Sequence, residues 1–180
     1  MNTMLHFTRL PRKTPRRKIA GLGVLGIALL MGILDPAKAG NNTVPYRGRT
    51  DGWVTSIQFS PGKKMFPVNL TTVADEISVH GGHGYQISSI TINSSKKSGL
   101  IATGKTDAVS ADREHLFIDF TIASQNADLT APIQYRGTFT IVGGTGRFEG
   151  ATGSGELWGE ARLTEGTWCG EFDGVISIPR

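Results

Sequence analysis

The chain has 180 residues, and its 19 Lys and Arg against 15 Asp and Glu give a formal net charge of +4. Residues 1–39 hold seven of the basic residues and one acid, whereas residues 40–180 hold 12 basic and 14 acidic residues. The main part of the chain is therefore slightly acidic and has the length of one domain, which argues against a nucleic-acid-binding protein.

The first 39 residues have the pattern of a cleaved export signal. A basic stretch ends at Lys18, and Ile19 to Leu34 then carry no charge; such a segment is short for a membrane span. Ala37-Lys38-Ala39 matches the small residues that a signal peptidase requires. We predict a signal peptide over 1–39, a single domain over 40–180 with no membrane span, and a secreted or periplasmic location. An uncleaved anchor is the alternative, and Arg16-Arg17 leaves Sec and twin-arginine export open.

The segment after residue 39 contains 20 glycines and a single cysteine, Cys169. An exported domain with one cysteine has no internal disulfide, so its stability must come from the core and from backbone hydrogen bonds. A lone half-buried thiol is more often structural than catalytic.

Residues after 40 read as short runs with a two-residue period, separated by Gly, Asn, Asp and Ser, which is the pattern of antiparallel sheet. In 133–141 the apolar residues share one face and the polar residues the other. The expected strands are 46–59, 67–78, 84–93, 99–108, 115–123, 133–142, 154–164 and 168–178. Eight strands without helices between them predict an all-β sandwich or closed barrel, and closure removes exposed edges.

A glycine-rich segment, Gly143-Gly144-Thr145-Gly146-Arg147-Phe148, follows the strand expected at 133–142. A dinucleotide fingerprint would need Gly where Glu149 stands, no Lys-Ser or Lys-Thr of a P-loop is present, and a strand rather than a helix comes next. We interpret the segment as a turn that places Phe148 under the barrel and lets Arg147 reach a carbonyl or carboxylate.

The stretch Ile-Val-Gly-Gly-Thr-Gly-Arg-Phe-Glu-Gly-Ala-Thr-Gly, residues 141–153, resembles plant dirigent proteins and the bacterial proteins grouped with them as the allene oxide cyclase barrel-like superfamily. Gly137-Thr-Phe-Thr and the strand around 170–178 also resemble bacterial, exported members. The resemblance covers roughly 115–178, and residues 41–114 match only in general strand pattern.

This resemblance implies an eight-stranded antiparallel, calycin-type β-barrel whose apolar lumen accepts small, flat or lipid-like molecules. It further implies that the lumen binds a ligand or steers cyclisation and coupling without a redox cofactor, in dimers or trimers.

Aromatic residues on the expected strands are the candidate ligand-binding residues, although core packing uses the same residue types. These candidates are Trp53, Phe59, Phe120, Tyr135, Phe139, Trp168 and Phe172.

Acid/base chemistry depends on which strand face lines the lumen. If the apolar faces fill it, strand carboxylates such as Asp119 face solvent. If the lumen is polar, Asp119 with His115 is the best catalytic pair, and Tyr135 is a further candidate. His80-Gly-Gly-His83 is a weak pattern for zinc, which usually takes three or four ligands, so we expect a solvated loop and no metal or cofactor.

Three functions remain open from the sequence. The first is binding of a small apolar molecule in the lumen, the second is a cofactor-independent isomerase or cyclase using the same lumen, and the third is a structural or envelope protein with a packed barrel. The fold supports the first two without deciding between them.

Overall fold

The computed structural model describes residues 42–62, 65–95, 99–126 and 128–179, so the predicted signal peptide lies outside the described residues. The chain forms eight strands and one short 3-10 helix, which are β1 (Asn42–Phe59), β2 (Val68–Ser78), β3 (Gly82–Ser95), β4 (Gly99–Val109), β5 (His115–Ser124), β6 (Ile133–Gly144), η1 (Gly146–Phe148), β7 (Thr152–Arg162) and β8 (Thr167–Ile178). Among the described residues, no helix has the length and hydrophobicity that a transmembrane helix requires.

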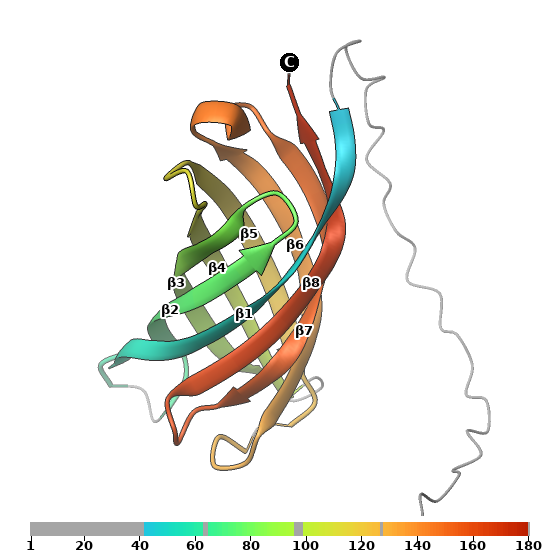
Figure 1. Cartoon of the computed structure of the whole chain (residues 1–180). Helices are drawn as coiled ribbons and strands as arrows, with labels where there is room; N and C mark the ends of the chain where they lie inside the picture. Colours follow the sequence, from blue (N-terminus) through green and yellow to red (C-terminus); the bar gives the residue numbers. More distant parts are fainter. Residues whose placement is uncertain (1–41, 63–64, 96–98, 127, 180) are drawn as a thin grey trace, which may run out of the picture. The chain divides into compact units, whose positions relative to one another are not determined.

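The strands form one closed antiparallel barrel in chain order, and β8 pairs back onto β1 (Figure 1). The predicted all-β, eight-stranded antiparallel barrel is confirmed, and the predicted strand limits differ from the observed ones by four residues or fewer. Two register shifts, between Val54 and Ser56 in β1 and between Phe117 and Ile118 in β5, interrupt the ladder. Such bulges bend a strand and increase its local twist.

The connections between strands gather at the two ends of the barrel. The end that we call the η1 end carries η1 with the β2–β3 and β4–β5 turns, and the opposite end, which we call the β7–β8 end, carries the turn between β7 and β8 (Figure 1). Each end of the lumen has its own apolar cluster. Tyr46, Leu116, Phe139, Ile141, Phe148 and Ile176 pack at the η1 end, and Val68, Leu70, Ile92, Leu100, Ala102 and Ile133 pack at the β7–β8 end.

The η1 end is held together by Arg147. Its Nη1 donates to Asp112 Oδ2 and its Nη2 to the His80 carbonyl, each at 3.0 Å, while its Nε lies 3.0 Å from Glu114 Oε2. The adjacent Phe148 is 1% exposed. Arg147 therefore joins the β2–β3 turn, the β4–β5 turn and η1, and Phe148 fills the barrel end beneath them, as the glycine-rich turn predicts.

Candidate functional site

A cavity of about 160 Å³ occupies the lumen between the two apolar clusters. Residues from all eight strands line it, because alternate residues of each strand point inward. Two walls of different chemistry face each other across this space. Strands β5 to β8 contribute most of the aromatic rings, and strands β1 to β4 contribute most of the polar side chains.

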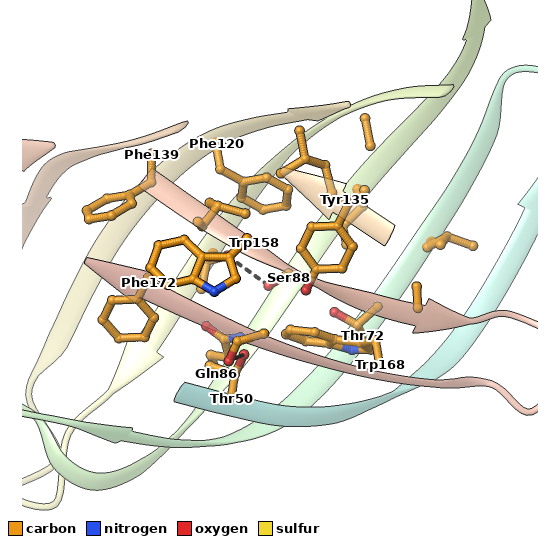
Figure 2. Close-up of a pocket in the computed structure, with 18 of the residues that line it drawn as sticks. Thr50, Thr72, Gln86, Ser88, Phe120, Tyr135, Phe139, Trp158, Trp168 and Phe172 are labelled. Atoms are coloured by element: carbon orange, nitrogen blue, oxygen red, sulfur yellow. Dashed lines mark hydrogen bonds between the residues drawn. The ribbon is translucent and has the colours of Figure 1, made fainter. Parts of the chain in front are cut away.

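The aromatic wall contains Phe120, Tyr135, Phe139, Trp168 and Phe172 (Figure 2). Its rings meet Tyr46 of β1 at the η1 end. The Tyr46 and Phe172 ring centroids are 4.9 Å apart, and the Phe139 ring stands edge-on to both, at 5.9 and 6.1 Å. Edge-to-face packing of this kind is favourable for aromatic rings, and it sets the position of the wall.

Inward-facing glycines make room for these rings. A Cβ atom on Gly48 would lie 2.6 Å from the Phe172 ring, one on Gly155 would lie 2.6 Å from the Phe139 ring, and one on Gly170 would lie 2.6 Å from the Tyr135 hydroxyl. At each of these three glycines, an aromatic side chain of another strand thus lies against the backbone.

The polar wall consists of buried side chains that point into the lumen. Its members are Thr50, Thr72, Glu76, Gln86, Ser88 and Thr106. Ser88 and Thr106 share a hydrogen bond of 2.8 Å between their hydroxyl oxygens. An apolar ligand with one polar edge fits such a lumen better than a purely aliphatic one does, because the edge can pair with these groups.

Glu76 is the buried acid of this wall. It is 5% exposed, and its Oε1 accepts a hydrogen bond of 3.2 Å from the Tyr46 hydroxyl. Burial raises the pKa of the Glu76 carboxyl above its ordinary value, and hydrogen bonds with Ser78 and Tyr46 partly oppose that rise. Burial and the nearby carboxyl raise the pKa of the Tyr46 phenol as well. The pair can hold or transfer a proton at the η1 side of the cavity.

Tyr135 is placed in the lumen, as its strand pattern predicts. Its hydroxyl donates a 3.0 Å hydrogen bond to the carbonyl of Cys169, and burial raises the pKa of its phenol. Tyr135 is therefore a neutral side chain whose proton is already engaged with the backbone. Its ring is available to a ligand as a flat contact surface.

Asp119 and His115 lie on the outer face of β5. Asp119 is 3.6 Å from Lys105 Nζ, and His115 Nδ1 lies 2.8 Å from Asp107 Oδ1. The two side chains thus have separate partners on β4, and neither lines the cavity. The apolar face of β5, which includes Ile118 and Phe120, occupies the lumen instead. This is the first of the two arrangements that the sequence left open.

Trp53, expected in the lumen wall, lies on the outer surface with 48% of its area exposed, and Phe59 is 62% exposed. The inward position next to Trp53 belongs to Gly52, where a Cβ atom would lie 2.7 Å from the Trp168 indole. Trp168 thus takes the lumen space that the sequence pattern assigned to Trp53. The other expected aromatic residues of 115–178 line the cavity.

Sequence reasoning missed the polar wall. In β2 the residues Val68, Leu70, Thr72, Ala74 and Glu76 share one buried face. A carboxylate in phase with apolar residues was the available signal, but a single Glu at the end of such a run also fits a strand that emerges into solvent.

No Lys, Arg or His side chain lines the cavity within the described residues. The same part of the chain contains no group of three or more His, Cys, Asp and Glu side chains placed to hold a metal ion. His80 lies in the β2–β3 turn, and His83 is the second residue of β3. The polar residues that line the cavity therefore offer hydroxyls, one amide, the Trp158 and Trp168 indoles and the Glu76 and Glu171 carboxyls.

Comparison with solved structures identifies this architecture. The structure of a pterocarpan synthase dirigent protein matches with a TM-score of 0.53 at 17% sequence identity, over 78% of this chain and 93% of that chain. The fold is that of a dirigent-like barrel. No protein-family model matches the sequence, and the search of curated proteins finds no match. At 17% sequence identity, the similarity between this chain and the dirigent protein concerns the fold alone. The link to allene oxide cyclase stays a prediction.

Proposed function

We propose that this dirigent-like barrel binds a small, flat, largely apolar molecule in its lumen. The observation that carries the proposal is the cavity of about 160 Å³ beside the aromatic wall. An apolar cavity of about 150 Å³ in another protein is large enough to hold benzene, so the space fits one aromatic ring without movement of the walls. A structural barrel with a packed core would use these side chains to fill the space, since protein interiors leave few voids larger than a water molecule.

Titration with benzene, followed by calorimetry, tests the binding proposal. Ala102 lines the cavity from β4, whereas Thr103 next to it is exposed on the outer face. We expect Ala102→Leu to weaken benzene binding at least about tenfold, because the added carbons occupy ligand space, and Thr103→Leu to leave it unchanged. Mass spectrometry of the solvent extract of the native protein should recover a hydrophobic molecule. Equal binding by the wild type and the Ala102→Leu variant would place the ligand outside the lumen.

A second candidate function is a cofactor-independent isomerase or cyclase, which the Glu76–Tyr46 pair favours. A carboxyl with a raised pKa beside an apolar space has the properties of a general acid, and the matched solved structure carries the name of a synthase. The test is turnover of the molecule recovered from the native protein. Glu76→Gln should abolish conversion while retaining binding, and Glu156→Gln, which changes an exposed carboxylate that does not line the cavity, should retain both. Conversion at the wild-type rate by Glu76→Gln would rule this candidate out.

We also place the protein outside the cytoplasm, on the basis of the basic, apolar and Ala-Lys-Ala pattern of residues 1–39. Amino-terminal sequencing of the protein recovered from the envelope or medium should then begin at Gly40. A chain that begins at Met1 and stays in the cytoplasmic fraction would contradict the placement.

A further inference from the structure

Two polar atoms of the lumen have no hydrogen-bond partner within the described residues. These are Thr72 Oγ1 on β2 and Trp168 Nε1 on β8, and both atoms are inaccessible to solvent. Thr72 is 2% exposed as a residue. Most buried polar groups in proteins are paired, and an unpaired one costs stability. Both residues line the same cavity, so a ligand there can supply the partner that these two groups lack, once their side chains turn toward it.

The two groups belong to one region of the cavity although their strands are separated by β1. The Trp168 indole reaches across Gly52 of β1, because a Cβ atom on that glycine would lie 2.7 Å from Trp168 Cε2 and 2.6 Å from the Cβ of Ala74 on β2. Ala74 and Thr72 are successive inward residues of β2, and Cε2 is the ring atom bonded to Nε1. Figure 2 draws Trp168 and Thr72 at the same corner of the pocket.

The donor chemistry of this pair selects the ligand atom. An indole N–H can only donate a hydrogen bond, and a threonine hydroxyl can donate as well as accept. Two donors on strands that flank β1 fit one acceptor oxygen with two lone pairs, as a carbonyl oxygen has. The Tyr135 hydroxyl does not compete for this role, since it already donates to the Cys169 carbonyl.

The charge of the lumen restricts the ligand further. No cationic side chain lines the cavity within the described part of the chain, and Glu76 is its buried acid. A carboxylate or phosphate would enter without a counter-charge, which is unfavourable in a buried site. The lumen therefore disfavours anions, and the acceptor oxygen that suits the two donors is that of a neutral carbonyl group and not of a carboxylate.

We propose that Trp168 and Thr72 form a carbonyl-binding subsite, so that the lumen selects neutral aromatic ketones or aldehydes. The ring of the ligand packs on the aromatic wall, and its carbonyl oxygen accepts hydrogen bonds from Trp168 Nε1 and Thr72 Oγ1. This assignment rests on the proposed function of the lumen as a binding site, and it adds the class of molecule that the site prefers. A site built to donate hydrogen bonds rejects analogues that lack the acceptor, because its own groups then remain unpaired.

The test compares three probes by calorimetry on the purified protein. Acetophenone and α-methylstyrene have nearly the same shape, but a CH₂ group replaces the carbonyl oxygen in the second, and benzoate adds a negative charge. We expect the wild type to bind acetophenone about tenfold more tightly than α-methylstyrene, the ratio that one net hydrogen bond confers, and to bind benzoate most weakly. The Trp168 indole proton should move downfield in the NMR spectrum with acetophenone only.

Matched variants show whether the two named groups cause this preference. Thr72→Val keeps the shape of the wall and removes one donor, so it should lower the affinity ratio toward one while α-methylstyrene affinity changes less than about twofold. Trp168→Phe removes the indole donor together with part of the ring, so its readout is the affinity ratio alone, which should also fall. Trp53→Phe on the outer face should keep the wild-type ratio.

Each result has a defined consequence for the proposal. Equal affinity of the wild type for acetophenone and α-methylstyrene, or an unchanged ratio in Thr72→Val, would overturn the carbonyl subsite and leave lumen binding standing. Benzoate affinity equal to that of acetophenone would overturn the selection for neutral ligands. Absence of binding by every probe would overturn the subsite together with the proposed function. If Trp168→Phe does not fold, Thr72→Val and the wild-type ratio decide.

Discussion

The hydroxyl oxygen of Tyr135 lies 2.6 Å from the point where a Cβ atom on Gly170 would be, and it donates a hydrogen bond to the carbonyl of Cys169, the preceding residue. The next atoms around that point are 3.3 and 3.4 Å away. A single phenol on β6 therefore explains why β8 has glycine at this inward position.

Gly170→Ala should destabilise the barrel by about 1–2 kcal/mol, since the new methyl group displaces the Tyr135 hydroxyl and breaks its hydrogen bond. The variant Tyr135→Phe lacks that hydroxyl, so Gly170→Ala should cost less in its background. Urea unfolding of the two single variants and the double variant measures the coupling between the residues, expected at about 1 kcal/mol. Strictly additive effects would mean that the methyl group meets something other than Tyr135.

Glu76 should make stability depend on pH in a direction opposite to that of a salt-bridged acid. Because burial raises the pKa of its carboxyl in the folded chain, the folded state keeps a proton that the unfolded state loses near pH 4.3, the ordinary value for Glu. The contribution of Glu76 is therefore fully present below that pH. It is lost as pH rises toward the raised pKa, by about 1.4 kcal/mol for each pH unit between the two values.

Urea unfolding of the wild type and Glu76→Gln between pH 4 and pH 8 checks this dependence. We expect the stability of Glu76→Gln to gain on that of the wild type as pH rises, because glutamine does not titrate. Glu156→Gln, which changes an exposed carboxylate that does not line the cavity, should follow the wild-type curve. Parallel curves for the wild type and Glu76→Gln would show that the carboxyl titrates alike in both states.

Arg147→Lys should loosen the η1 end. Lysine cannot reproduce the separate contacts of the guanidinium with Asp112, Glu114 and the His80 carbonyl. We expect a loss of about 1 kcal/mol, a moderate figure because the Arg147 side chain is 41% exposed. Hydrogen exchange should become faster in the β2–β3 and β4–β5 turns and stay unchanged at the β7–β8 end.

Arg47→Lys provides the matched control for this change. Arg47 and Asp173 form an ion pair of 3.7 Å in which both side chains are more than half exposed, so the substitution should cost less than about 0.5 kcal/mol. A similar loss in both variants would argue against Arg147 as the residue that joins the three segments.

Two inward threonines should respond in opposite ways to replacement by valine. Thr72→Val removes a buried hydroxyl that has no partner within the described chain, so the free protein should keep its stability or gain up to about 1 kcal/mol. Thr106→Val leaves the Ser88 hydroxyl without its 2.8 Å partner and should cost about 1–2 kcal/mol. Thermal unfolding without ligand measures both, and a loss in Thr72→Val equal to that in Thr106→Val would imply a hidden partner for Thr72.

The strands were predictable because most of them alternate over long runs. The run at 133–141 presents apolar residues on one face, and its partner strands do the same. The alternation of side chains along the strand was therefore enough to place Tyr135 and Phe139 inward. The alternation was a weaker guide in β1, because the inward residues Thr50, Gly52 and Val54 are less apolar than Trp53, which lies beside them and points outward. The error at Trp53 arose there, since an indole from β8 takes the space over Gly52.

The sequence by itself determined eight antiparallel strands and an aromatic face on β5 to β8, because these depend on the two-residue period within each strand, and it left a sandwich or a closed barrel open. Only the tertiary structure decided that Thr72, Glu76 and Ser88 form a polar wall opposite those rings, and that the Thr72 hydroxyl and the Trp168 indole stay unpaired. The physical reason is barrel closure, which brings β8 against β1. Pairing of buried polar groups depends on such contacts between distant strands, which no local pattern records.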